Sequence, residues 1–161
     1  MTRKIDIAAA PYIKGARYPA PYDVPCAGRE RWRLGDAAGL SQFGVNLLRL
    51  PAGQWSSQRH WHSAEDEFVY ILEGEVVLVT DDGEERLVAG DCAGFKADDG
   101  NGHHLQNRSS GDAVLLEIGS RRWGEGSVDY PDIDLTFPKG GKAFQRRDGR
   151  PYGPDDYRKD K

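Results

Sequence analysis

Short apolar runs separated by turn residues fill the middle of this chain, and no helical period of any length occurs between residues 43 and 120. The runs alternate with glycine, aspartate and asparagine, and the pair Asp82-Gly83 is typical of a β-hairpin because glycine tolerates a positive φ. Many short strands at this spacing predict an all-β fold, either a sandwich or a barrel. The expected strands cover residues 43–50, 67–72, 75–80, 85–88, 92–96, 103–107 and 113–119.

The regions on either side of this strand-rich core, residues 43–120, have a different character. Residues 1–42 are expected to supply an N-terminal arm and the first strand or strands, because their prolines disfavour a regular helix. This arm is either extended and pinned over a surface by its tyrosines or partly disordered. Residues 121–161 are expected to form a C-terminal extension with one possible edge strand at 143–146. The whole chain is interpreted as one domain.

The composition argues against several classes of protein. Lys plus Arg number 22 and Asp plus Glu number 26, so the formal charge of −4 disfavours a nucleic-acid partner. The two cysteines, Cys26 and Cys92, suggest neither a disulfide framework nor a thiolate zinc site. No segment approaches the ~20 apolar residues of a membrane helix, and the first residues lack the apolar run of a signal peptide. We therefore expect a cytoplasmic protein without a membrane or nucleic-acid partner.

All four histidines of the chain fall in two short clusters that are far apart in sequence. Residues i and i+2 of a β-strand share a face, so His60 and His62 are expected to project side by side. Glu67 leads into a buried strand close by, and His103 begins another strand from which its side chain can join them. We therefore predict a metal site made of His60, His62, Glu67 and His103.

Three imidazoles and one carboxylate form a donor set that suits Fe(II), Mn(II), Ni(II), Co(II) or Zn(II) better than Ca(II). One divalent transition metal per chain is expected. Four protein ligands on a six-coordinate ion would leave two positions open for a small-molecule ligand. The alternative interpretation is that these histidines only satisfy hydrogen bonds inside a core, as we would expect of a lone histidine.

The spacing of these residues resembles the two motifs of the cupin superfamily, a group of small β-barrels that often hold a metal at the centre. The resemblance covers residues 43–120 and implies a single jelly-roll barrel, also called a double-stranded β-helix. The run after Gly102 and the segment 148–152 look like single-domain bacterial cupins described as sugar-phosphate-isomerase-like or uncharacterised. Lys96 departs from the pattern because a proline is usual there, and the loop before His103 is longer than the common form. The first motif is filled by Gly53, His60, His62, Glu67 and Gly74, and the second by Gly90, Gly100, His103 and Asn107.

Five further residues are candidates for the pocket or for support of the metal ligands. His104 is expected to face away from the metal by strand parity and to act as a structural or supporting group. Gln58 could look into the pocket and Asn107 could orient a loop or ligand, but both could equally bond backbone groups. Arg49 could anchor an anionic substrate, although a surface ion pair is the preferred interpretation. Tyr70 is interpreted as a packed ring on the outward face rather than as a proton donor.

Two functions from different classes fit these residues. The first is a metal-dependent enzyme that acts on a small polar or anionic molecule, of the oxygenase, sugar-phosphate isomerase or decarboxylase type. The second is a non-enzymatic module in which the metal holds a ligand or only the fold. A transcriptional regulator is disfavoured because no pair of amphipathic helices precedes Phe43. The outward face of the 67–72 strand is expected to be covered by the arm or by a second subunit. A homodimer is expected as the partner arrangement.

Overall fold

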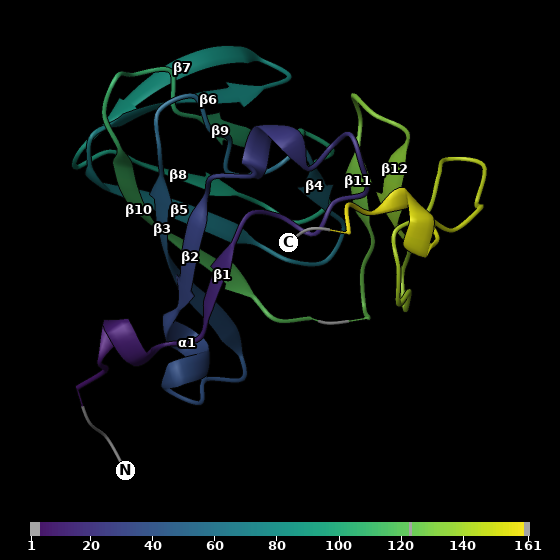
Figure 1. Cartoon of the computed structure of the whole chain (residues 1–161), viewed down its shortest axis with the longest axis horizontal. Coiled ribbons are helices and arrows are strands. Elements are labelled where there is room, and N and C mark those ends of the chain that lie inside the picture. Colours follow the sequence, from purple (N-terminus) through teal and green to yellow (C-terminus); the bar gives the residue numbers. More distant parts are fainter. Residues whose placement is uncertain (1–3, 123, 160–161) are drawn as a thin grey trace.

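Antiparallel β-strands make up nearly all of the regular structure, as Figure 1 shows. The computed structural model describes residues 4–122 and 124–159. The prediction of an all-β fold is confirmed. Its largest sheet has the strand order β1-β2-β3-β10-β5-β8. These strands are β1 (Tyr12–Lys14), β2 (Glu30–Arg33), β3 (Phe43–Leu50), β10 (Ala113–Ser120), β5 (Glu67–Glu73) and β8 (Cys92–Phe95).

Two smaller sheets complete the described part of the fold, and the helical pieces between the strands are short. One sheet packs the hairpin of β6 and β7 beside β9, and the other joins β12, β11 and β4. The strands are β6 (Glu75–Thr80), β7 (Gly83–Val88), β9 (His104–Gln106), β4 (Trp61–His62), β11 (Val128–Tyr130) and β12 (Leu135–Phe137). The helical pieces are α1 (Leu34–Ala37) and the 3₁₀ turns η1 (Ile7–Ala9), η2 (Val24–Cys26) and η3 (Pro154–Asp156).

The main core lies inside the barrel and follows the two-residue period of the strands. On β5, Val69 and Ile71 are buried, whereas the intervening Tyr70 is exposed. The turn from β5 to β6 requires Gly74, which has a positive φ and on which a Cβ would collide with the carbonyl oxygen of Asp112. The buried members of this core are Leu48, Leu50, Val69, Ile71, Val76, Leu78, Leu87, Leu105, Ala113 and Leu115.

The N-terminal arm becomes part of the barrel wall. Its strand β1 pairs with β2, and β2 pairs in turn with β3, so the arm adds two strands to the edge of the large sheet. Tyr18 is buried against Tyr130 and Leu135 of the C-terminal extension. The arm and the extension therefore share a second apolar cluster outside the barrel core, next to the sheet that contains β4.

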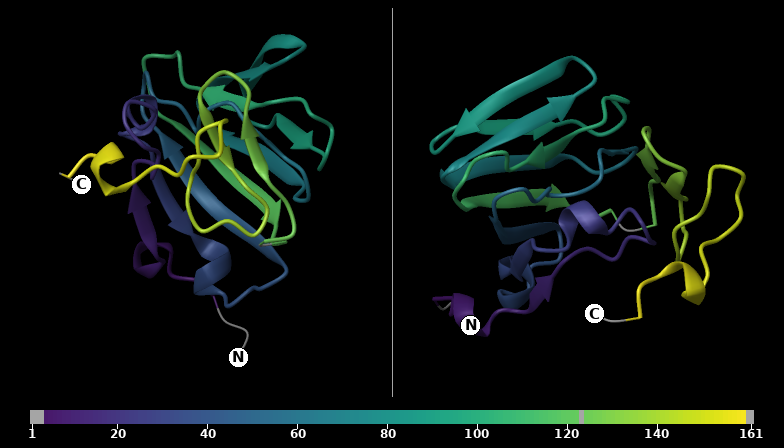
Figure 2. Two further views of the ribbon diagram at one scale, coloured as in Figure 1. Left: turned by 90° about the vertical axis from the view of Figure 1, so that its right-hand side faces the viewer. Right: turned by 45° about the horizontal axis from the view of Figure 1, so that its top comes forward.

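The C-terminal extension differs from its prediction. The edge strand expected at 143–146 is reduced to isolated bridges from Gln145 to Thr136 and Pro151. Instead, the extension contributes β11 and β12, and β11 pairs with β4, which carries His62. Figure 2 shows the extension packed to one side of the barrel. This segment therefore forms a wall next to the histidine motif.

The outward face of β5 is left open by the rest of the described chain. Phe68, Tyr70 and Leu72 are 38%, 39% and 41% exposed, because the arm joins the opposite edge of the sheet instead of crossing this face. Of the two coverings expected for this face, the arm is therefore excluded for the described residues, and the second subunit stays a prediction. No helix among the described residues is long and apolar enough to cross a membrane.

Candidate metal centre

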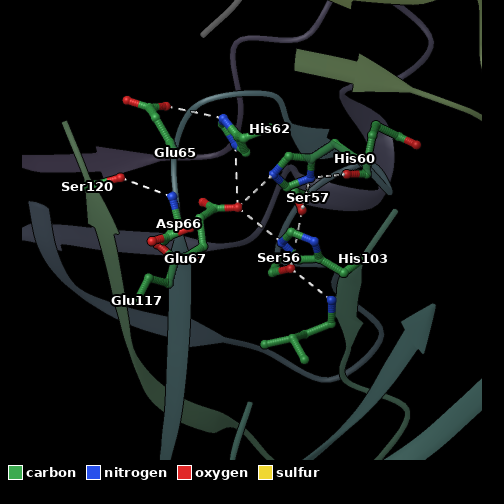
Figure 3. Close-up of polar contacts among 12 residues, drawn as sticks. Ser56, Ser57, His60, His62, Glu65, Asp66, Glu67, His103, Glu117 and Ser120 are labelled. Carbon is green, nitrogen blue, oxygen red and sulfur yellow. Dashed lines mark hydrogen bonds and ion pairs between the residues drawn. The ribbon is translucent and has the colours of Figure 1, made fainter. Parts of the chain in front are cut away.

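The side chains predicted as metal ligands meet at one oxygen atom. The Nε2 atoms of His60 and His62 each lie 3.4 Å from Oε2 of Glu67. Nε2 of His103 lies 3.0 Å from the same oxygen. Figure 3 shows the three imidazoles converging on the Glu67 carboxylate. Residues that are distant in sequence thus form a single cluster.

Three chain segments bring these groups together. His60 and His103 face each other in a two-residue bridge, in which the backbone N–H of His60 donates to the His103 oxygen at 3.1 Å and His103 returns the bond at 2.9 Å. His62 lies two residues further along in β4, on the same side as His60, and Glu67 opens β5. Strand alternation and one cross-strand bridge therefore account for the convergence.

The outer nitrogens of two imidazoles are fixed by hydrogen bonds. Nδ1 of His60 donates to the backbone oxygen of Gln58 at 2.9 Å, and Nδ1 of His62 lies 3.2 Å from the Glu65 carboxylate. Such partners fix the tautomer and leave Nε2 with a lone pair for a metal. His103 differs, since its Nδ1 is buried without a hydrogen-bond partner among the described residues and its ring stacks on Phe95, with 3.6 Å between the ring centres.

The electrostatics of the cluster favour the metal-binding protonation states of Glu67 and His103, but not that of His62. Burial alone would raise the pKa of Glu67, but its contacts with the His103 and His60 imidazoles hold the pKa well below its usual range. Burial lowers the pKa of His103. Burial would also lower the pKa of His62, but the Glu65 carboxylate beside it raises the pKa overall. At neutral pH the site therefore offers an ionised carboxylate and a neutral His103.

The spacing of the donor atoms fits a transition metal. Donor atoms of His60, His62 and Glu67 all lie within 4.8 Å of one another. Two ligands bound at about 2.1 Å and separated by about 90–110° are about 3.0–3.4 Å apart, and the three nitrogen-to-oxygen separations fall in this range. Hydrogen bonding within a core, the alternative considered for these histidines, explains the outer nitrogens of two rings and the contact of His103 with Glu67, but it does not require the Nε2 atoms of His60 and His62 to converge on the same oxygen. The group fits the metal class predicted from the sequence.

A cavity of about 430 Å³ opens beside the cluster and contains several charged residues that the sequence analysis did not single out. They include Glu65, Glu117 and three arginines, Arg29, Arg31 and Arg33. The arginines occupy alternate positions in Arg29-Glu30-Arg31-Trp32-Arg33, so their parity could have indicated a common face. A first strand or strands were predicted within residues 1–42 but were not located at these arginines, so their common face was missed.

His104 and Gln58 support the site without joining the donor atoms. Nδ1 of His104 donates to the Ser57 oxygen at 3.0 Å, while its Nε2 accepts from the Gln106 amide at 3.0 Å. Its ring is buried, and this desolvation lowers its pKa to about 4. The Gln58 amide donates to the backbone oxygen of Tyr22 at 2.6 Å, which ties the arm to the segment that carries His60. Gln58 therefore bonds a backbone group, which was one of the two roles considered for it.

The remaining three candidates also lie away from the donor atoms. Asn107 is buried, and its amide donates to the backbone oxygens of Leu50 and Gly111, so it fixes a loop. The Arg49 side chain is 46% exposed and forms ion pairs with carboxylates on the outer surface, and it does not line the cavity. Tyr70 lies on the outward face of β5. Arg49 therefore lies in surface ion pairs and Tyr70 lies on the outward face, as the preferred interpretations expected.

Comparisons with known proteins identify the family of the chain. Residues 46–119 match the family model of the cupin domain. A solved structure from Silicibacter pomeroyi DSS-3, described as a sugar phosphate isomerase from a cupin superfamily, is 44% identical, with a TM-score of 0.86. That match covers 95% of this chain and 98% of the other.

Two further solved structures extend the comparison, and no curated protein matches the chain. A putative sugar phosphate isomerase from Acidithiobacillus ferrooxidans ATCC 23270 is 31% identical, with a TM-score of 0.67 over 74% of this chain and 75% of that one. A predicted oxalate decarboxylase from Thermotoga maritima is 21% identical, with a TM-score of 0.58 over 73% of this chain and 98% of that one, and supports the fold alone. This chain belongs to the cupin superfamily and has the single-domain jelly-roll fold of its bacterial members.

Proposed function

We propose that this cupin is a metal-dependent enzyme that acts on a small anionic molecule. The observation that carries the proposal is the convergence of three imidazole Nε2 atoms on Oε2 of Glu67 at the wall of a 430 Å³ cavity. In this proposal His60, His62, Glu67 and His103 hold one divalent transition metal. A cavity of this volume accommodates a small metabolite beside the ion.

Isomerisation of a sugar phosphate is the first reaction to test, because the relative at 44% identity is described as a sugar phosphate isomerase and the relative at 31% as a putative one. Such a reaction moves one proton between adjacent carbons and one between their oxygens, so it consumes no co-reactant. The bound metal would supply Lewis acidity at the substrate oxygens. Glu117 lines the cavity and is the residue to which we assign proton transfer between carbons.

The test starts with elemental analysis of protein purified without added metal. The metal-loaded protein is then incubated with aldose and ketose phosphates, and interconversion is followed by NMR. His62→Ala is expected to lose the metal and turnover together, whereas Glu117→Gln is expected to lose turnover and keep the metal. Unchanged turnover in His62→Ala would exclude this site as the catalytic centre. Oxygenation and decarboxylation are screened in parallel with catechols and small acids.

A non-enzymatic binding module is the second candidate, and one observation favours it. Two carboxylates that face the cavity are already engaged, Glu65 with His62 and Glu117 with Arg31. The contact with His62 lowers the pKa of Glu65, which makes this carboxylate a weaker base. If this candidate is correct, a ligand will bind to the metal-loaded protein and be recovered unchanged after long incubation.

We also propose that two copies of the chain form a homodimer. The support is the exposed apolar face of β5, where Phe68, Tyr70 and Leu72 have no covering element among the described residues. Large apolar patches on a protein surface usually mark an interface. Tyr70→Lys is expected to shift the mass measured by light scattering from two chains to one. A wild-type protein that stays monomeric at high concentration contradicts the proposal.

A further inference from the structure

Three arginines reach the cavity from one segment of the wall. Arg29 lies immediately before β2, Arg31 and Arg33 lie within it, and all three line the cavity that contains the histidines. The residues between them, Glu30 and Trp32, pair across the sheet with Lys14 and Tyr12 of β1. One face of this short strand is therefore cationic and faces inward.

Two of these guanidinium groups have carboxylate partners. Arg31 lies 2.9 Å from Glu117, and Arg33 lies 3.0 Å from Asp36. The Nε atoms of Arg31 and Arg33 are both buried without a hydrogen bond among the described residues, but Nε of Arg33 lies beside the Asp36 carboxylate, whereas Nε of Arg31 has no such partner. The pairing neutralises the charge of Arg31 and leaves part of its donor capacity unused.

Arg29 has no carboxylate partner among the described residues. Its Nε donates to the Gly15 oxygen at 3.0 Å and its Nη1 donates to the Ser56 oxygen, so it bonds only neutral carbonyl groups. The residue is 7% exposed, and burial lowers its pKa. The carboxylates that line the cavity are each engaged elsewhere, namely Asp36 with Arg33 and Arg121, Glu65 with His62, Glu67 with the histidines and Glu117 with Arg31.

A buried guanidinium without a counter-ion is costly, because desolvation of a charge is repaid only when an opposite charge comes close. Arginine stays protonated under ordinary conditions, so Arg29 cannot escape the cost by losing its proton. A divalent metal at the neighbouring cluster would add two positive charges, of which Glu67 offsets one. The cavity would then hold a net positive charge that a bound anion can balance.

We propose that Arg29, together with the unused donor capacity of Arg31, binds an oxyanion group of the substrate, a phosphate or a carboxylate. The inference rests on the proposed function, since it places the anion in the same cavity as the metal ligands. It adds a second anchor, so the substrate class becomes a small molecule with an anionic group at one end and metal-binding oxygens at the other. Arginine suits this role because its planar fork matches the geometry of oxyanions.

The test measures binding of simple anions to the full-length protein, loaded with metal, by isothermal titration calorimetry. Inorganic phosphate and acetate serve as the two oxyanion probes, and erythritol serves as a neutral polyol. Binding of either anion, with no binding of erythritol, is expected. The stronger of the two anions identifies the substrate as a phosphate ester or a carboxylic acid.

Variants then locate the anion. Arg31→Gln and Arg29→Lys are expected to weaken binding about 10-fold or more, because a hydrogen bond to a charged group is lost. Arg29 also ties the arm to the Ser56 segment, so circular dichroism and thermal unfolding check that its variant folds. If Arg29→Lys does not fold, Arg31→Gln carries the test.

Two other arginines provide matched controls. Arg33→Gln removes the same charge from the same strand, and Asp36 keeps Arg121 as a partner, so a change of less than about twofold is expected. Arg49→Gln removes an exposed arginine outside the cavity and should also leave binding unchanged. Equal weakening in all four variants would indicate a general charge effect and overturn the assignment.

One more variant separates this inference from the proposed function. His62→Ala removes a metal ligand but leaves the arginines, so phosphate or acetate should still bind to it. Loss of all anion binding in His62→Ala would mean that the anion binds the metal, and the arginine site would be rejected. If no substrate is turned over but anion binding still depends on Arg29 and Arg31, the proposed enzyme activity fails and the anion site stands.

Discussion

The two halves of the barrel interior are built from the same strands but differ in chemistry. On β5 the inward residues change from Glu67 to Val69 and Ile71, and on the antiparallel β10 they change from Glu117 to Leu115. One half is therefore an aliphatic core, and the other is a polar cavity with the candidate metal ligands. Along β5 and β10, the side chains that stabilise the fold and the side chains that line the candidate site therefore occupy different ends of the same strand.

The polar half is less favourable for folding than the aliphatic half. Burial of apolar side chains stabilises the barrel, whereas each buried charge needs a partner or a ligand. His103 Nδ1 and Arg31 Nε are buried and unpartnered among the described residues. Changes in the aliphatic half should therefore alter stability, and changes in the polar half should alter binding and its dependence on pH.

The largest effect on stability is expected from Leu115→Ala in the aliphatic half. Leu115 is fully buried between β3 and β5, so the substitution leaves a cavity and should lower the free energy of unfolding by about 2–5 kcal/mol. Urea denaturation measures this change. Metal content of the folded variant should match the wild type, because Leu115 lies outside the ligand cluster. Leu40→Ala, at an exposed position, should change stability by less than about 0.5 kcal/mol.

A pH effect should arise in the polar half from His104. Its folded-state pKa is about 4, below its ordinary value of 6.5, so the unfolded chain binds a proton more readily. The stability from this group is complete above about pH 6.5 and is lost as the pH falls toward 4, by up to about 3 kcal/mol. Chelator-treated wild type and His104→Gln are compared by thermal unfolding across this range. Parallel curves for the two proteins would show that His104 does not contribute.

Metal binding should stabilise the polar half by mass action. At a free metal concentration of 100 times Kd, the free energy of unfolding should rise by about 2.7 kcal/mol. The increase is measured by unfolding with and without Fe(II), Mn(II), Co(II), Ni(II) or Zn(II), and His62→Ala should abolish it. Leu40→Ala should keep the full increase. A wild-type protein whose melting temperature ignores every one of these ions would contradict a metal site.

The sequence predicted the central strands well because their signals are local. The period of two in residues 67–72 and the turn at Asp82-Gly83 are readable without any knowledge of the fold. The strands β11 and β12 were missed because each has only three residues and β11 depends on pairing with β4, which is far away in sequence. Pairing of this kind is decided by tertiary structure.

For the site, spacing between histidines was sufficient to predict the cluster around Glu67, because strand parity and one bridge decide it. The arginines were harder to place. Arg49 stood out as a charge in an apolar strand, yet it lies outside, whereas Arg29 and Arg31 sit in a charged segment that resembles an exposed surface. Only the position of β2 in the barrel wall turns these charges inward.

The smallest effect is expected where the C-terminal extension meets the polar half. The Arg59 guanidinium forms a fork with Asp132, at 2.7 and 2.5 Å, and also pairs with Asp81 after β6. Asp132 is mostly exposed, so Asp132→Asn should lower the free energy of unfolding by at most about 1 kcal/mol, and less at high salt.

Urea denaturation at low and high salt measures this effect, and Asp155→Asn serves as a control in a fully exposed pair. A small change in the free energy of unfolding for Asp132→Asn means that the extension is held mainly by its apolar cluster with Tyr18. The wall beside β4 is then stabilised by apolar burial, as the aliphatic half is. A loss of several kcal/mol would instead mean that this ion pair holds the wall in place. In that case a charged pair outside the barrel would contribute to stability as much as apolar residues do inside it.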